Sequence, residues 1–357
     1  MHSNNSSMIE VRNIAKRFGS VTALDNIRFS VSRGELFFLL GPSGCGKTTM
    51  LRILAGLETQ DKGSILYNGK DVAELPPHKR GAPMVFQNYA LWPHMSVYEN
   101  VAFGLVESKT PKKEIVARVN QALEQVNLFG MGNRMPNQLS GGQQQRVVLA
   151  RALVMNPHTV LLDEPLSNLD AKLRSEMREE IEALHKNTDI TFIYVTHDQI
   201  EALSLADRMA MMDNGKICAI GTPSALYHRP PSLFCATFLG EANALQGTVL
   251  NVVGNMVITD TAIGKIKAVY QGNTPTIGTS VNCIIRPENI RIDGAGDNSA
   301  QAIILSSRMT GATTTLLLDV NGTILRAVML NEYGSNPAAG TMVTAVFKAT
   351  DTIVVTS

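Results

Sequence analysis

Residues 36–55 read LFFLLGPSGCGKTTMLRILA, and this stretch decides the fold. The apolar run 36–40 predicts a buried strand, and residues 48–55 predict a helix directly after it. The glycines, lysine and threonine between them have the spacing of a phosphate loop, in which backbone N–H groups, an ammonium and a hydroxyl surround phosphates. The alternative is a Gly-rich turn that only closes a strand. It is disfavoured because the strand, the lysine, the threonine hydroxyl and the helix all occur at the positions that a phosphate loop requires. The candidate phosphate-binding residues are Gly41, Pro42, Ser43, Gly44, Cys45, Gly46, Lys47, Thr48 and Thr49.

Three of these residues have individual expectations. Lys47 is expected to reach the β and γ phosphates, and the Thr48 hydroxyl is expected to ligate Mg²⁺. Nearby N–H groups and Lys47 are expected to lower the pKa of the Cys45 thiol.

Two further apolar runs end in polar residues that suit phosphate chemistry. The first ends in Leu161-Leu162-Asp163-Glu164-Pro165, where Asp163 would hold Mg²⁺ and Glu164 would act as general base toward a water molecule. The second, 190–195, ends in Thr196-His197-Asp198 and brings an imidazole to the same edge of the sheet. The alternative is that Asp163 and Glu164 only cap a strand end, and that His197 is a surface or capping residue. The neighbouring phosphate loop makes these alternatives the weaker interpretation.

The wider pattern predicts two domains. Apolar strands alternate with amphipathic helices at 111–128 and 171–186, which indicates an α/β domain. From residue 241 onward, short Val, Ile, Leu and Thr runs between Gly, Asn and Pro indicate a β domain, whose possible diverged halves one sequence does not reveal. Asn-Gly pairs predict tight hairpins at 68–69, 214–215 and 321–322.

Composition excludes several classes of protein. The 32 basic and 31 acidic residues nearly balance, so nucleic acid is not an expected partner. The four cysteines, Cys45, Cys218, Cys235 and Cys283, lack Cys-x-x-Cys spacing and suit a reducing compartment such as the cytoplasm. Residues 1–8 are polar and are expected to be a frayed tail and not a secretory signal. No apolar run approaches the ~20 residues of a membrane-spanning helix, so any membrane function requires another chain.

A second anion site is predicted at Leu139-Ser140-Gly141-Gly142-Gln143. The serine and glycines directly precede a helical run, 143–155, so N–H groups and a hydroxyl lie at a positive helix end. Its expected ligand is another face of the same nucleotide.

With this segment the sequence resembles the ABC transporter ATPases over essentially all of the first domain. The resemblance implies a phosphate-loop ATPase of the ABC type with a helical subdomain at about 88–157, which binds ATP and Mg²⁺. It also implies a homodimer, in which Ser140, Gly141, Gly142 and Gln143 of one chain reach the nucleotide held by the other. The resemblance implies four further site residues. Gln87 is the lid glutamine, which is catalytic and lies near the metal, and His197 is the catalytic switch histidine. Asp170 lies in the D-loop 167–170, and Phe18 stacks on adenine.

The resemblance extends to the importer ATPases for sugars, polyamines, sulfate and ferric iron. It rests on residues 85–96, on Phe238-Leu-Gly and on Ile285-Arg-Pro-Glu-Asn-Ile-Arg291, which is similar to the OB-like TOBE domain. It implies an ATPase domain at 8–240, a smaller all-β TOBE domain at 241–357, and a peripheral position on the cytoplasmic face of the inner membrane. The implied partners are integral membrane permease subunits and, through them, a periplasmic or extracellular solute-binding protein.

Several alternatives remain open. Polyamine, ferric iron, sugar, phosphonate and sulfate are all candidate substrates, with polyamine or iron favoured by residues 238–244. The apolar segment 88–95, which contains Trp92, predicts either a docking surface for the permease or a small satellite core under a loop. A soluble ABC ATPase of DNA repair or translation is the competing function, although coiled-coil insertions and paired cassettes are absent from the sequence. The β domain as a ligand sensor is compatible with the importer, and a metabolite phosphotransferase is remote.

Overall fold

The computed structural model describes residues 7–331 and 337–356, and these divide after Pro223 into two compact units. This division precedes the boundary expected between residues 240 and 241. The reason is that helices α7 (Pro223–His228) and α8 (Leu233–Phe238) pack with the β domain: Ala236 of α8 shares an apolar cluster with residues of that domain. The expected polar tail is also wrong at its end, because Ser7 and Met8 begin strand β1 and Met8 is buried; residues 1–6 lie outside the described residues.

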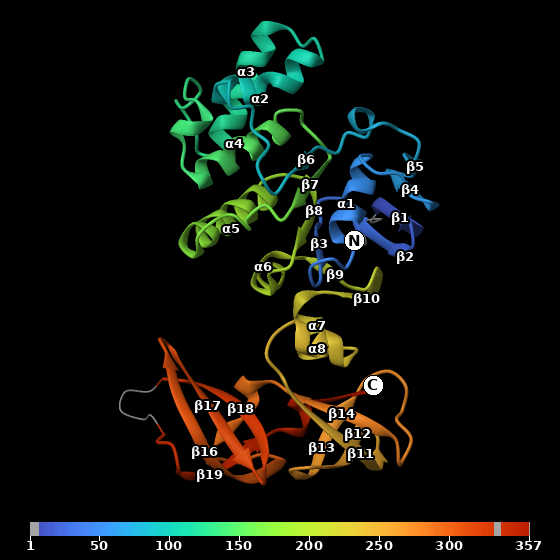
Figure 1. Cartoon of the computed structure of the whole chain (residues 1–357), viewed down its shortest axis with the longest axis vertical. Helices are drawn as coiled ribbons and strands as arrows, with labels where there is room; N and C mark the ends of the chain where they lie inside the picture. Colours follow the sequence, from blue (N-terminus) through green and yellow to red (C-terminus); the bar gives the residue numbers. More distant parts are fainter. Residues whose placement is uncertain (1–6, 332–336, 357) are drawn as a thin grey trace, which may run out of the picture. The chain divides into compact units, whose positions relative to one another are not determined.

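The first unit is built on a six-stranded sheet in the order β10-β9-β3-β8-β7-β6 (Figure 1). All neighbouring pairs run parallel except β9 and β10. The strands are β3 (Leu36–Leu40), β6 (Met84–Val85), β7 (Thr159–Asp163), β8 (Thr191–Thr196), β9 (Arg208–Asp213) and β10 (Lys216–Gly221). Because the parallel strands share one direction, their carboxyl ends meet at one edge of the sheet.

Each face of this sheet is covered. On one face, Phe37, Leu39 and Ile193 share a core with helix α1 (Lys47–Ala55) and with the antiparallel sheet β2-β1-β4-β5. On the other, Phe38 stacks on Tyr194 beneath helix α6 (Gln199–Leu205), beside which lies α5 (Ala171–Lys186). The strands of the antiparallel sheet are β1 (Ser7–Phe18), β2 (Val21–Ser32), β4 (Lys62–Tyr67) and β5 (Lys70–Asp71).

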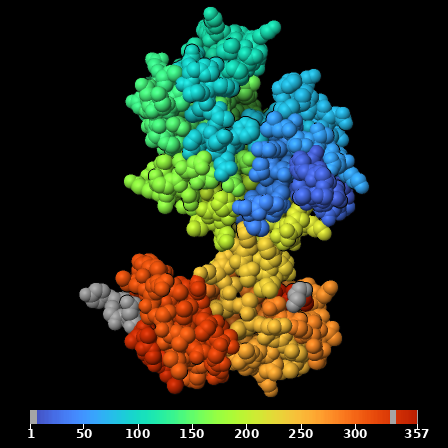
Figure 2. Space-filling model, viewed as in Figure 1, coloured from blue at the N-terminus to red at the C-terminus, as the bar shows by residue number. Residues whose placement is uncertain are grey.

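A helical part interrupts the sheet between β6 and β7. Helices α2 (Val97–Glu107), α3 (Lys112–Gln125) and α4 (Gly141–Leu153) pack against one another and form the cyan-to-green lobe of Figure 2. The buried Asn100 fixes the loop before α2, since its amide bonds both the N–H and the carbonyl of Trp92 and two further carbonyls.

The second unit contains two β bodies. A closed barrel is formed by β11 (Asn243–Val253), β12 (Met256–Thr261), β13 (Gly264–Tyr270), β20 (Thr352–Thr356) and β14 (Ser280–Ile285). A five-stranded sheet is formed by β15 (Arg291–Ile292), β19 (Met342–Phe347), β16 (Asn298–Thr310), β17 (Thr313–Val320) and β18 (Thr323–Leu330).

The chain crosses between the two β bodies twice, through similar segments. Strand β14, a 3₁₀ turn at Pro287–Asn289 and β15 follow one another, and β19, a 3₁₀ turn at Ala349–Asp351 and β20 repeat that order. Strand β15 then pairs with β19, and β20 pairs with β14. The two strand–turn–strand segments are therefore similar in form, and diverged halves of the β domain stay a prediction.

The Asn-Gly hairpins are confirmed. Asn321 and Gly322 have φ values of 51° and 85°, and they connect β17 to β18 with Val320 opposite Thr323. The same left-handed pairs connect β4 to β5 and β9 to β10. Within residues 7–331 and 337–356, no helix has the length and apolar character needed to span a bilayer.

Candidate nucleotide site

Four groups of predicted site residues follow the ends of four adjacent strands. The phosphate loop follows β3, His197 follows β8, Glu164 follows β7 and Gln87 comes two residues after β6. The register aligns these ends, because Leu40 pairs with Thr196, and Asp163 pairs with Val195. The structure therefore brings together at one sheet edge residues that the sequence separates by as much as 156 positions, from Gly41 to His197.

The phosphate loop is closed by backbone conformation that only glycine tolerates. Gly46, the N-cap of α1, has φ of 106°, and a Cβ there would lie 2.5 Å from the carbonyl oxygen of Ala23. The Lys47 ammonium is buried and donates to the carbonyls of Gly41 at 2.8 Å and Pro42 at 2.9 Å. This ammonium and the N-terminal N–H groups of α1 give the loop the positive potential that phosphates require.

The expectation for the Cys45 thiol is wrong. Its side chain is buried within the loop, and burial raises the pKa of the thiol more than nearby Lys47 lowers it. Desolvation disfavours the thiolate, so we expect the Cys45 thiol to react slowly.

Thr48 and Asp163 form a candidate Mg²⁺ site. The Thr48 hydroxyl donates to Oδ1 of Asp163 at 3.1 Å, which places two oxygen ligands side by side. Asp163 is only 7% exposed, and burial together with Glu164 raises the pKa of its carboxyl although Thr48 and two cations oppose this. Among the described residues no group of three or more His, Cys, Asp and Glu side chains could hold a metal by itself. Mg²⁺ suits such a sparse oxygen site, since it keeps waters and phosphate oxygens as its other ligands.

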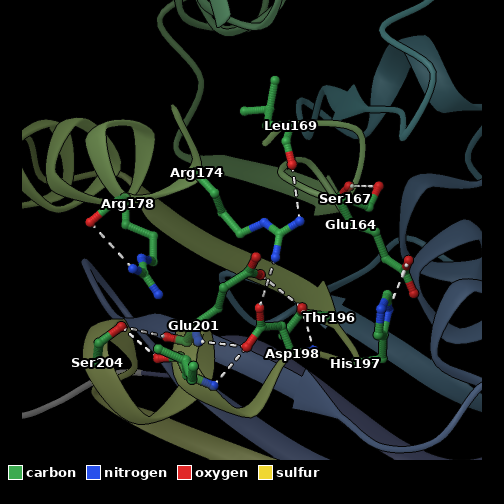
Figure 3. Close-up of polar contacts among 12 residues, drawn as sticks. Glu164, Ser167, Leu169, Arg174, Arg178, Thr196, His197, Asp198, Glu201 and Ser204 are labelled. Carbon is green, nitrogen blue, oxygen red and sulfur yellow. Dashed lines mark hydrogen bonds and ion pairs between the residues drawn. The ribbon is translucent and has the colours of Figure 1, made fainter. Parts of the chain in front are cut away.

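Glu164 and His197 face each other, as Figure 3 shows, with Nδ1 of His197 at 3.1 Å from Oε2 of Glu164. Glu164 has a positive φ of 44°, and its N–H donates to the carbonyl of Val195 at 3.0 Å. The Ser167 hydroxyl donates to the carbonyl of Glu164. A non-glycine residue in this strained conformation persists only where its surroundings hold it, which is common at functional sites.

The lid, which comprises Gln87 and the segment 88–95, contacts the D-loop. The side-chain amide of Asn168 donates to the carbonyl of the exposed Gln87 at 2.7 Å. Asp170 caps helix α5 by accepting from the N–H of Leu173. The D-loop therefore fixes the backbone at Gln87 and leaves its side chain accessible.

The predicted second anion site lies at the start of α4. Ser140 is exposed and is the N-cap, and Gln143 completes a capping box with it. Gly142 permits close packing, because a Cβ there would lie 2.7 Å from Leu173. This helix packs with α2 and α3, whereas α1 packs on β7 and β8. The structure thus places Ser140 and the phosphate loop on different parts of the first unit.

Phe18, at the end of β1, is 48% exposed, and the Lys16 ammonium lies 5.1 Å from its ring centre. An exposed ring is available for a planar ligand, and adenine stacking stays a prediction.

Sequence reasoning missed several residues that organise this site. Arg151 donates to the carbonyls of Tyr89 and Ala90, two consecutive residues with positive φ, and lies over the Trp92 ring. Arg174 donates to the carbonyl of Leu169 in the D-loop. In the sequence, each of these residues is only a charged residue within a predicted helix. The sequence alone does not distinguish an arginine that binds backbone carbonyls from one that lies on the surface.

This fold and these motifs define a phosphate-loop ATPase. A family model described as ABC transporter matches residues 24–167, and a TOBE domain model matches residues 283–355. The spermidine/putrescine import ATP-binding protein of Rubrobacter xylanophilus is 46% identical over 312 residues, which cover 87% of this chain and 83% of that protein. The corresponding protein of Pseudomonas aeruginosa is 50% identical over 286 residues, or 80% of this chain and 78% of the relative.

Solved structures agree with these matches. A structure of cbiO1 from Clostridium perfringens, part of the ABC transporter complex cbiONQ, has a TM-score of 0.58 and 30% identity over 62% of this chain and 90% of that one. An ATP-binding cassette dimer with bound ADP and Pi has a TM-score of 0.55 and 30% identity over 60% of this chain and 99% of that one. The chain belongs to the ABC transporter family as an ATP-binding subunit with a TOBE domain, and it is an ATPase. The expected family and fold class are confirmed.

Proposed function

We propose that this chain is the ATP-hydrolysing subunit of an importer for polyamines. The observation that carries this function is the single sheet edge at which the phosphate loop, the Thr48–Asp163 pair and the Glu164–His197 pair meet. The polyamine substrate is taken from the relatives, which are named spermidine/putrescine import ATP-binding proteins. Ferric iron, sugar, phosphonate and sulfate, left open by the sequence, are the alternative substrates.

The site chemistry follows from the positions of these residues. Lys47 and the N–H groups of the loop bind the β and γ phosphates, and Phe18 stacks on the adenine. Glu164 accepts a hydrogen bond from the attacking water and takes its proton as the oxygen adds to the γ phosphorus and the bond to ADP breaks. His197 holds Glu164 and would contact a γ-phosphate oxygen. Positioning and charge stabilisation supply most of the acceleration in phosphoryl transfer.

Thr48 and Asp163 would hold Mg²⁺, and Gln87 would contact its water ligands. When bound, the ion would supply positive charge to the β and γ phosphate oxygens. Their support is the 3.1 Å contact of the two oxygens and the raised pKa of the Asp163 carboxyl, which a divalent cation would relieve.

The complete site requires two copies of the chain. Ser140 is exposed at the positive end of α4, in a helical part distinct from the elements that carry the phosphate loop. A partner's Ser140 N-cap segment would close over the γ phosphate, and Asp170 and the D-loop would lie at the same interface. Hydrolysis would then open the dimer.

The permease docks, in this proposal, on the helical part of the first unit. A largely apolar cavity of about 500 Å³ lies there, with Met95, Phe103, Val106 and Val116 in its lining. It adjoins the lid, since the Trp92 ring packs 4.2 Å from that of Phe103. A permease helix in this cavity would move the lid and Gln87. The chain would work at the cytoplasmic face of the membrane, with a solute-binding protein on the far side of the permease.

Reconstitution tests this function. The chain is combined with its neighbouring permease genes and a binding protein, and uptake of radiolabelled spermidine is measured in vesicles loaded with ATP. Spermidine uptake that requires ATP, and that is absent with Glu164→Gln, is the expected result. ATP hydrolysis without uptake of any polyamine would contradict the proposed substrate. If no permease bound the chain, a soluble ABC ATPase would be the remaining alternative.

A further inference from the structure

Glu201 is a buried carboxylate for which neither the phosphate loop nor the Mg²⁺ site has a use. It lies in the first turn of α6, is 3% exposed, and comes four residues after His197. Burial is the main cause of a raised pKa for its carboxyl. Burial of a carboxylate costs free energy. Such a group is retained where its hydrogen bonds hold a conformation that the function requires.

The hydrogen bonds of Glu201 lead directly to the residues on either side of His197. The Thr196 hydroxyl donates to Oε2 of Glu201 at 2.7 Å, and the Tyr194 hydroxyl donates to the same oxygen at 3.0 Å. The N–H of Asp198 donates to the Thr196 hydroxyl oxygen at 2.9 Å. A backbone N–H can only donate, so the direction of the chain is fixed: Asp198 to Thr196 to Glu201. The bonds of such a chain strengthen one another in a buried setting.

This chain surrounds His197. Its neighbours Thr196 and Asp198 are tied to each other and to Glu201, while the imidazole itself is half exposed and touches Glu164. Glu164, Thr196, His197, Asp198 and Glu201 line one cavity of about 50 Å³ (Figure 3). The imidazole is therefore placed by its backbone, and the backbone is placed by the buried carboxylate.

Arg174 holds the same loop from the other side. Its guanidinium donates to the carbonyl of Leu169 at 3.0 Å and lies 3.6 Å from Oδ2 of Asp198. It lines the same cavity. Asp198 in turn caps α6 by accepting from the N–H of Ile200.

We propose that Glu201 is a positioning residue for ATP hydrolysis, which holds the Thr196 hydroxyl and the backbone around His197 so that the imidazole stays beside Glu164. The inference rests on the proposed roles of Glu164 and His197. Glu201 acts here only as a hydrogen-bond acceptor. The side-chain amide oxygen of glutamine at position 201 can therefore accept the same hydrogen bonds.

The test compares turnover in four variants of the full chain. Glu201→Ala and Thr196→Val each break the chain and should lower kcat for ATP by about tenfold, with KM for ATP within about twofold. Glu201→Gln should retain most of kcat. Glu35→Ala is the matched control, because Glu35 is also buried, but it precedes the amino end of β3 and bonds the Ser32 N–H and Arg208. It should lower the melting temperature and leave kcat unchanged.

A double-mutant cycle with His197→Ala separates positioning from general destabilisation. In the His197→Ala background, measured by single-turnover hydrolysis of radiolabelled ATP, Glu201→Ala should cause no further loss. A full tenfold further loss in that background would overturn the proposal, as would normal kcat in Glu201→Ala or a Glu201→Gln enzyme as slow as Glu201→Ala. If Glu201→Ala does not fold, Thr196→Val gives the same cycle. Failure of the proposed function is distinguishable, because Glu164→Gln would then hydrolyse ATP normally.

Discussion

Nδ1 of His197 lies 3.1 Å from Oε2 of Glu164, although the two residues follow different strands of the central sheet. The contact exists because β7 and β8 are parallel neighbours in a register that aligns Asp163 with Val195. It pairs the candidate base with an imidazole and leaves the imidazole half exposed toward a ligand. Substitution of Glu164, on one side of this contact, gives the first prediction.

Glu164→Gln should keep ATP binding and lower kcat by a factor on the order of 10² to 10⁴, because the amide preserves shape but cannot accept a proton. ATP affinity by a fluorescent analogue and turnover by phosphate release check this. With ATP present, size-exclusion chromatography should show a trapped dimer. Near-normal hydrolysis would contradict the assigned base.

Asp163→Asn should not destabilise the nucleotide-free chain at neutral pH. The pKa of Asp163 is raised in the folded state, so the folded chain binds this proton more tightly than the unfolded chain does. The free energy of unfolding therefore falls as pH rises from the ordinary carboxyl pKa through the folded pKa, and the amide removes this loss. Thermal unfolding should show an unchanged or higher melting temperature without ligand, and loss of the extra stabilisation by Mg²⁺ with ATP. A large destabilisation without ligand would argue against a purely metal-binding carboxylate.

Ser140→Arg in the Glu164→Gln chain should abolish the ATP-dependent dimer. The bulky cation fills the exposed N-cap of α4, where the partner's γ phosphate is proposed to sit. Light scattering with and without ATP measures the mass. Ser108→Arg, at the exposed end of α2, is the control and should still dimerise. A stable ATP-dependent dimer with Ser140→Arg would contradict the proposal that the nucleotide site is formed by two chains.

Cys45 should react with thiol reagents far more slowly than the exposed Cys218. Burial raises the pKa of the Cys45 thiol, so its thiolate is scarce at neutral pH and its labelling rate should rise through the alkaline range. Peptide mass spectrometry of the unchanged chain follows the labelling rates of both cysteines, and ATP should slow that of Cys45 further. Fast labelling at neutral pH would show that the loop opens.

Arg151→Ala should uncouple the lid from the permease. Its guanidinium donates at 2.8 Å and 3.1 Å to carbonyls of two lid residues with positive φ, and it covers the Trp92 ring. Loss of this clamp should leave the basal ATPase rate within about twofold and reduce stimulation by the permease. Arg151→Lys should restore little, because one ammonium does not replace the planar guanidinium fork. Equal stimulation in all three chains would contradict a coupling role.

Local sequence was sufficient for much of this protein. Each Asn-Gly pair specified its hairpin, since only residues that tolerate positive φ fit there. The run from Leu36 through Ala55 specified a strand, a phosphate loop and a helix, because glycine spacing and apolar periodicity are local properties. The order of the motifs along the chain specified the family.

Tertiary structure alone decided how these pieces meet. Whether the pKa of the Cys45 thiol is raised or lowered depends on burial, which the sequence does not state, and burial outweighs the charge of Lys47. The roles of Arg151, Arg174 and Glu201 depend on carbonyls and hydroxyls distant from them in sequence or across a helical turn. The physical reason is that conformation preferences act between neighbours along the chain, whereas desolvation and hydrogen bonding of a buried charge depend on every element that packs around it.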